Sequence, residues 1–370
     1  MTQRIRVGIV FGGASSEHDV SCMTAGGVSR AIDADRFDVI GIGITPSGRW
    51  VQVPADELRA LRKQGDELPR LSESRATAVL LPGEAGGARV ATIEGDRLVD
   101  LHDFDVAFTL LHGPFGEDGT IQGMFELLGL RYVGSGVAAS ANGMDKDLMK
   151  RHLSASGLPG CRFVTVTDRQ WSQQREQSID RIAKLGYPLF VKPARGGSSV
   201  GITKVDRADD LEQAVLFAQK FDPKLVVEEA VLGAREIEFA VLGGRGAAPR
   251  VSLPGEIVMR EAGAFYDFDA KYVSDDDAAL LVPTEMDDDL RRRAADVAAR
   301  TFEAMGAEGL ARVDLFITAD GHVLVNEINT MPGFTHISMF PSLWAASGLD
   351  YTTLITDLID QALERPVGLR

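Results

Sequence analysis

Two acidic residues and an amide flank a turn signal near the C-terminal end of the sequence. The pair Asp320-Gly321 is typical of a two-residue β-hairpin loop. Pairing the flanking strands across that loop places Asp314 opposite Glu327 and Arg312 opposite Asn329. Because side chains alternate between the two faces of a strand, these four residues share one face.

Directly opposed carboxylates, about 5 Å apart at Cβ, repel one another and destabilise a sheet unless a cation offsets their charge. Two carboxylates and an amide oxygen suit a magnesium ion, which prefers oxygen ligands and keeps waters or substrate phosphates in its other positions. The pattern therefore predicts Asp314, Glu327 and Asn329 as metal ligands. The alternative is a solvated hairpin face that carries ordinary charges.

A lysine followed by a loop of glycine and serine forms a second chemical signal. Lys192 ends an apolar run, and residues 196–201 read Gly-Gly-Ser-Ser-Val-Gly. Free backbone N–H groups in such a loop form a cradle for phosphate. The segment is not a Walker loop, because there the lysine comes directly after the last glycine, whereas here it precedes the loop. An ordinary strand followed by a flexible turn is the alternative.

Polar clusters also follow two predicted strands, at residues 11–21 and 111–120. In open α/β sheets, ligands bind beyond the carboxyl ends of the strands, so both clusters are candidate substrate contacts. Ser16 and Asp19 also fit a capping box, which makes a helix start the alternative for the first cluster. In the second cluster, we favour a buried structural role for His112 over that of a catalytic base.

Composition excludes several classes of protein. The chain has 370 residues, a formal net charge of −15 and two cysteines without zinc-site spacing. No apolar run approaches the roughly 20 residues of a membrane span, and no signal peptide is apparent, so we expect a cytoplasmic protein without a membrane or nucleic-acid role. Residues 134–139 match a dinucleotide-binding fingerprint, but no acidic residue follows at the required distance, which argues against a nicotinamide cofactor.

The elements that must position these residues change in character along the chain. Short strands alternate with helices in the first half, which predicts an α/β fold with a parallel sheet. After residue 225 several strands follow one another around one long helix near 287–305, which predicts α+β structure with an antiparallel sheet. Residues 54–101 look like a mobile insertion. We predict three domains, at residues 1–134, 135–227 and 228–370.

Taken together, these motifs resemble those of the D-alanine–D-alanine ligases, members of the ATP-grasp superfamily. The resemblance spans nearly the whole chain and rests on residues 12–21, 112–119, 144–146, 192–201, 265–272 and 312–338. It implies a three-domain ATP-grasp architecture, with an N-terminal parallel-sheet domain, a central subdomain, and a C-terminal subdomain that carries the metal site and a lid loop. Gly197 departs from the pattern, since many members have an acidic residue there.

The resemblance also implies a role for each matching residue. The predicted catalytic residues are Glu17, Ser198, Tyr272, Arg312 and Gly333. The predicted ATP contacts are Lys146, Lys192, Ser199, Glu228, Glu229, Val231, Glu236 and Lys271. The predicted substrate contacts are His112, Ser338 and Met339, and the metal ligands are again Asp314, Glu327 and Asn329.

The implied reaction joins two D-alanine molecules through an acyl phosphate, with ATP and two Mg²⁺ ions, for which Mn²⁺ can substitute. ADP and phosphate are the by-products, and the dipeptide serves as a peptidoglycan precursor. A homodimer is what the family suggests. Two alternatives are a ligase that joins D-alanine to D-lactate, against which Tyr272 argues, and a nucleotide-binding regulator without activity, against which the complete set of polar residues argues.

Overall fold

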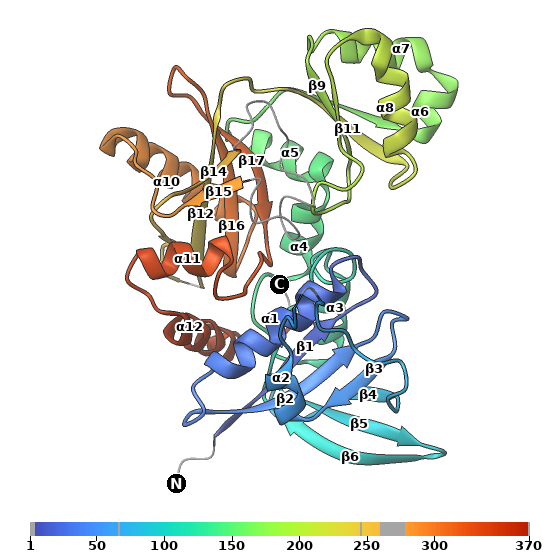
Figure 1. Ribbon diagram of the computed structural model, residues 1–370, viewed down its shortest axis with the longest axis vertical. Helices are drawn as coiled ribbons and strands as arrows, with labels where there is room; N and C mark the ends of the chain where they lie inside the picture. Colours follow the sequence, from blue (N-terminus) through green and yellow to red (C-terminus); the bar gives the residue numbers. More distant parts are fainter. Residues whose placement is uncertain (1–3, 66, 245, 260–277, 369–370) are drawn as a thin grey trace.

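The computed structural model describes residues 4–65, 67–244, 246–259 and 278–368. It is a mixed α/β structure with four sheets (Figure 1). Lys271 and Tyr272, with the rest of the predicted lid segment 265–272, lie outside the described residues. Within the described part of the chain, no helix has the length and apolar character needed to cross a membrane.

The N-terminal sheet has the strand order β3-β2-β1-β7. Its strands are β1 (Ile5–Gly12), β2 (Phe37–Ile44), β3 (Trp50–Val53) and β7 (Val106–Thr109). β1 runs parallel to both β2 and β7, as predicted, whereas β3 is antiparallel to β2. The apolar run that makes β1 a strand is buried from Val7 onward, so the polar residues that follow it emerge at the carboxyl edge of the sheet.

The prediction of a mobile insertion at residues 54–101 missed regular structure. A short helix, α2 (Ala55–Ala60), is followed by an antiparallel sheet of three strands. These are β4 (Ala78–Pro82), β5 (Ala88–Glu94) and β6 (Arg97–Phe104). Most of β5 is buried, and Ala88 and Val90 enter the core, which explains why so polar a segment folds.

The sheet of the central segment has the strand order β10-β9-β11-β8 and is antiparallel throughout. Its strands are β8 (Phe163–Thr167), β9 (Leu189–Pro193), β10 (Thr203–Val205) and β11 (Lys224–Glu229). Helices pack beside it at the upper right of Figure 1, namely α6 (Asp168–Gln173), α7 (Arg175–Ala183) and α8 (Leu211–Ala218). The strand at 163–167 lies in the first half of the chain, for which the sequence analysis predicted a parallel sheet, but it belongs to this antiparallel sheet.

The C-terminal sheet has the strand order β15-β14-β12-β16-β17, and β13 also pairs with β12. Its strands are β12 (Arg235–Gly243), β13 (Arg250–Val251), β14 (Gly255–Met259), β15 (Ala278–Leu281), β16 (Gly309–Ile317) and β17 (Val323–Asn329). The predicted long helix is α10 (Asp288–Ala304), whose buried face packs on this sheet. The antiparallel sheet predicted for the last third of the chain is thus confirmed.

Helices connect these layers. The connecting helices are α1 (His18–Ala31), α3 (Thr120–Leu128), α4 (Val137–Met144), α5 (Lys146–Ala155), α11 (Met339–Ala346) and α12 (Tyr351–Glu364). One apolar core extends from β1 and α1 to α11 and α12. Helix α12 contacts β7 of the N-terminal sheet and lies beside α1, whereas α11 packs on β12 (Figure 1). The division into three domains stays a prediction.

Candidate active site

The carboxylates singled out in the sequence do face each other across β16 and β17. Asp314 pairs with Glu327, and Arg312 pairs with Asn329. The turn, however, is not the two-residue loop that the sequence analysis assumed, because Thr318 and His322 pair and leave three residues between them. A register shift next to Asp314 opposes two residues of β17 to one of β16 and restores the predicted pairing. The longer turn and the bulge each shift the strand pairing by one residue in opposite directions, so the predicted pairs still form.

Both carboxylates have a cationic partner within the chain. Arg312 donates to Asp314 through two bonds, Nε to Oδ1 and Nη2 to Oδ2, each 2.7 Å long. Asn329 Nδ2 donates to Asp314 Oδ2 at 3.0 Å. Lys146 Nζ lies 3.9 Å from Glu327 Oε2. The repulsion that argued for a metal ion is thus already offset by an arginine and a lysine.

Lys146 connects this face with the glycine–serine loop. The side chain of Asp145 caps α5 by accepting from the backbone N–H groups of residues 147 and 148, which places Lys146 at the first position of the helix. Its Nζ donates to the carbonyl of Gly196 at 2.7 Å. Burial, together with the nearby Lys192, lowers the pKa of Lys146, although Glu327 opposes this shift. The ammonium group of Lys146 therefore lies close to both the glycine–serine loop and the carboxylate Glu327, which are far apart in the sequence.

Lys192 shares a buried carboxylate with a second lysine. The register of β9 and β11 places Lys192 and Glu228 on the same face, where they form an ion pair, and Lys150 Nζ lies 2.7 Å from Glu228 Oε2. Burial works to raise the pKa of Glu228, but the two lysines outweigh it and lower the pKa to about 2. Burial likewise works to lower the pKa of Lys192, and the Glu228 carboxylate more than reverses the effect. Lys192 and Glu228 are therefore both charged at neutral pH.

The glycine–serine loop bends back toward the first cluster. Ser198 and Ser199 both have positive φ angles, of 49° and 59°, a conformation that is uncommon outside glycine and that is often found at functional sites. Ser198 Oγ donates to Glu17 Oε1 at 2.6 Å. The capping box predicted for Ser16 is not formed, since the helix begins at His18 with Glu17 as its N-cap and without a side-chain cap bond. The carboxylate of Glu17 thus contacts the loop and does not cap its own helix.

His112 is buried next to Glu17. Its Nδ1 lies 3.2 Å from the carbonyl of Met331 and 3.6 Å from Glu117 Oε1. Burial works to lower the pKa of His112, and the carboxylate of Glu117 raises it above its ordinary value. Gly113 has a φ of 71°, and a Cβ there would lie 2.7 Å from Glu17 Oε2, so this close approach requires glycine. The burial of His112 is confirmed, while its structural role and any contact with substrate stay predictions.

The segment that leads into α11 brings together the remaining predicted substrate contacts. Ser338 is the N-cap of α11, and a Cβ on Gly333 would lie 3.2 Å from Ser338 Oγ. Thr335 holds the hydroxyl of Ser338, with 2.7 Å between the two side-chain oxygens. Met339, the first residue of the helix, is buried in the apolar core. The start of a helix suits a carboxylate because its backbone N–H groups point outward.

The predicted adenine and ribose contacts lie along a strand edge. Glu229 ends β11, and its carboxylate binds Arg162 at 2.6 Å, so we expect its backbone rather than its side chain to meet a ligand. Val231 follows the strand and is half-buried. Glu236 lies on β12, two residues before Glu238, and therefore on the same face as the carboxylates of the hairpin. These three assignments stay predictions.

The donor set of the hairpin fits a hard divalent cation. Asp314 and Glu327 provide carboxylate oxygens and Asn329 an amide oxygen, all on one face of two paired strands. Among the described residues, no three His, Cys, Asp or Glu side chains converge as a metal cluster, so two carboxylates and an amide form the candidate set. At Asp314 and Glu327, a metal ion would compete with the cations that these carboxylates already contact, Arg312 and Lys146 respectively.

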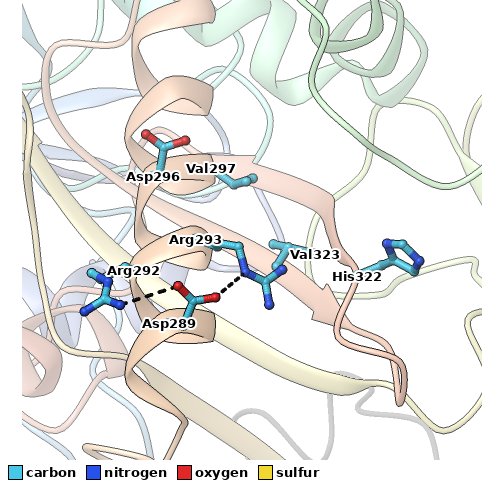
Figure 2. Close-up of a pocket in the computed structure, with 7 residues that line it drawn as sticks. All are labelled: Asp289, Arg292, Arg293, Asp296, Val297, His322 and Val323. Atoms are coloured by element: carbon cyan, nitrogen blue, oxygen red, sulfur yellow. Dashed lines mark hydrogen bonds and ion pairs between the residues drawn. The ribbon is translucent and has the colours of Figure 1, made fainter.

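A surface hollow of about 520 Å³ lies elsewhere, between α10 and the start of β17 (Figure 2). It is lined by Asp289, Arg292, Arg293, Asp296, Val297, His322 and Val323. Asp289 pairs with both Arg292 and Arg293, so the charges of the hollow largely satisfy one another. None of the residues predicted for the active site lines it.

Comparison with known proteins identifies the family. The family model described as D-ala D-ala ligase N-terminus matches residues 6–135, and the one described as D-ala D-ala ligase C-terminus matches residues 152–360. A D-alanine–D-alanine ligase of Arthrobacter sp. (strain FB24) is 52% identical over 99% of this chain and 96% of its own length. The chain belongs to the D-alanine–D-alanine ligase family. A ligase of the same name from Mycobacterium avium (strain 104) is 46% identical over 100% of this chain and 99% of its own.

Solved structures of this ligase family share the fold. The D-Ala:D-Ser ligase VanG of Enterococcus faecalis superposes with a TM-score of 0.82, at 33% identity over 97% of this chain and 100% of that one. The D-alanine–D-alanine ligase of Coxiella burnetii gives a TM-score of 0.81, at 32% identity over 98% of this chain and 95% of that one. The ATP-grasp fold expected from the sequence is thereby confirmed.

Three residues of this ligase-family site escaped the sequence analysis. Lys150 lies four positions after Lys146 on α5, so helical periodicity could have placed both on one face. Glu238 lies two positions after Glu236, which strand alternation could have revealed. Glu117 stands within a motif that was noticed, but no role was given to it.

Proposed function

We propose that the protein joins two D-alanine molecules into D-alanyl-D-alanine and converts ATP to ADP and phosphate. The observation that carries this proposal is the position of Lys146, which contacts the phosphate-loop carbonyl of Gly196 and approaches Glu327 of the carboxylate face. This contact supports a single site in which the proposed phosphate-binding and metal-binding groups act together. Glu17, which reaches the same loop through Ser198, adds a carboxylate suited to the ammonium group of an amino acid.

In the first step, the carboxylate of one D-alanine attacks the γ-phosphate of ATP and forms an acyl phosphate. Two anions must approach each other, so Lys146 and Lys192 lower the barrier by offsetting their charge. When bound, Mg²⁺ or Mn²⁺ would neutralise phosphate charge and would be held by Asp314, Glu327 and Asn329. Glu17 would hold the ammonium group of this D-alanine.

In the second step, the neutral amine of another D-alanine attacks the acyl carbon, and phosphate leaves. The tetrahedral oxyanion needs hydrogen-bond donors, and the guanidinium of Arg312 and the backbone N–H of Gly333 are the candidates. Ser338 and the start of α11 would receive the carboxylate of the second D-alanine. Lys271 and Tyr272 would belong to a lid that excludes water from the acyl phosphate, a role that the family resemblance suggests.

The choice of second substrate can be tested directly. Phosphate release is measured with ATP, Mg²⁺ and D-alanine, and the second substrate is then varied among D-alanine, D-serine, D-lactate and L-alanine. D-serine is included because a solved relative is named as a D-Ala:D-Ser ligase. When the product of each mixture is identified together with the phosphate, we expect D-alanyl-D-alanine throughout, and a predominant product that contains D-lactate or D-serine would reassign the second substrate. We also expect a homodimer, which sedimentation can check.

A further inference from the structure

Glu238 is a buried carboxylate to which no role has been given. It lies on β12, directly across from Asp314 on β16, and only 4% of its surface is exposed. Its Oε2 lies 3.1 Å from Arg312 Nε. A buried carboxylate is costly unless it is paired, and the guanidinium of Arg312 supplies a counter-charge to Glu238.

Arg312 therefore serves two carboxylates at once. Its Nε and Nη2 form a two-bond fork with Asp314, and the same Nε also faces Glu238. The strand pairing explains this arrangement, because Glu238 reaches the guanidinium from β12 while Asp314 holds it from β16 itself. The fork with Asp314 uses Nε and Nη2, so Nη1 is the guanidinium nitrogen that lies outside this fork.

The fork on Asp314 conflicts with the proposed use of Asp314 as a metal ligand. Both oxygens of Asp314 already accept hydrogen bonds, from Arg312 and from Asn329. A divalent cation on Asp314 would repel the guanidinium and compete for the same lone pairs. Arg312 can then remain in the site only if a second anion holds it, and among its contacts in the described chain Glu238 is that anion.

We propose that Glu238 is a positioning residue, which keeps Arg312 aimed at the reacting carbonyl when Asp314 turns its oxygens to the metal. This inference rests on the proposed ligase function and adds to it a residue that acts through Arg312. Glu238 itself touches neither substrate nor metal. Its loss would leave the nucleotide site intact and would misplace the oxyanion donor.

The test compares Glu238→Gln and Glu238→Ala with a matched control, Glu256→Gln. Glu256 is also a buried carboxylate of this sheet, bound by Arg235 at 2.6 Å, but it lies outside the site. We expect kcat for dipeptide synthesis to fall about tenfold in Glu238→Gln and about a hundredfold in Glu238→Ala, because a charged hydrogen bond is weakened or lost. The KM for ATP should stay within about twofold, and Glu256→Gln should keep its kcat.

A second measurement, hydrogen exchange of the Arg312 side chain, does not depend on turnover. In protein labelled with ¹⁵N-arginine, the Nε–H signal of Arg312, assigned with Arg312→Lys, should exchange slowly with solvent. In Glu238→Gln we expect slow exchange in the apo protein, where Asp314 still holds the guanidinium, and fast exchange once Mg²⁺ and ADP are added. The wild type should remain protected in both conditions.

Several outcomes would overturn the inference. These are an unchanged kcat in Glu238→Ala, an equal loss of kcat in Glu256→Gln, or a protected Arg312 signal in Glu238→Gln with Mg²⁺ and ADP. If neither Glu238 variant folds while Glu256→Gln does, Glu238 is a stability residue and the inference fails. Failure of the wild type to make dipeptide would instead refute the proposed function, while the exchange measurement would still report on Glu238 and Arg312.

Discussion

Glu228 allows a stability prediction from a single buried group. It is 2% exposed and lies between Lys150 and Lys192. Despite its burial, the two lysines lower the pKa of its carboxyl from an ordinary 4.5 to about 2. A shift of that size corresponds to about 3 kcal/mol of stabilisation at neutral pH. We therefore expect Glu228→Gln to lose about 3 kcal/mol of unfolding free energy.

The pH dependence gives the sign of the effect. Because the pKa of Glu228 is lower in the folded protein, its contribution is complete above about pH 4.5 and is lost as the pH falls toward 2. The difference between wild type and Glu228→Gln should thus be constant from about pH 5 to 8 and smaller near pH 3. Removing one lysine as well, in Glu228→Gln with Lys150→Met, should recover a large part of the loss, since fewer buried charges remain unpaired.

Urea unfolding at several pH values measures these differences. Glu229→Gln is the matched control, because the neighbouring Glu229 binds Arg162 on a half-exposed surface, where an ion pair contributes at most about 1 kcal/mol. A loss in Glu228→Gln no larger than that of Glu229→Gln would refute the reasoning. So would a difference that grows as the pH falls from 5 to 3.

Three further predictions concern the site. Asp314→Asn should abolish phosphate release and lower the free energy of unfolding by about 2 kcal/mol, because Arg312 loses a charged acceptor. Glu327→Gln should also abolish phosphate release but should cost little stability, since Lys146 lies farther from this carboxylate. Equal melting temperatures of the two variants would contradict this difference. Gly113→Ala should raise the KM for D-alanine at least about tenfold. Gly157→Ala is the control and should leave this KM unchanged, because Gly157 has a similar φ but open space around it. Equal KM values for the two variants would refute the steric argument. Glu17→Gln should raise the KM for D-alanine far more than that for ATP, and equal effects on both would count against a role in binding the amino acid.

The carboxylate pair was predictable because it depends on local rules. Strand alternation and one turn signal placed Asp314 opposite Glu327, and the structure has that pairing. The turn itself has three residues between the paired Thr318 and His322, and a bulge compensates for it. Neither feature could be read from the sequence, because a bulge depends on how the sheet twists and packs.

The contacts between distant segments were beyond the reach of sequence patterns. Helix α12 packs on the N-terminal sheet, and Lys150 meets Glu228 across 78 positions of the chain, from 150 to 228. The sheet of β4 to β6 was missed because its sequence is polar and rich in glycine, although alternate residues enter the core. The family resemblance named Glu17 and Ser198 as catalytic residues, and the structure joins them by a hydrogen bond.

The most direct test of the central claim is the stoichiometry of the reaction. The purified protein is incubated with ATP, Mg²⁺ and D-alanine, and dipeptide and phosphate are quantified together. We predict one D-alanyl-D-alanine for each phosphate released, no product with L-alanine, and no product from Glu327→Gln. Phosphate release without dipeptide, or dipeptide formation by Glu327→Gln at the wild-type rate, would contradict the account.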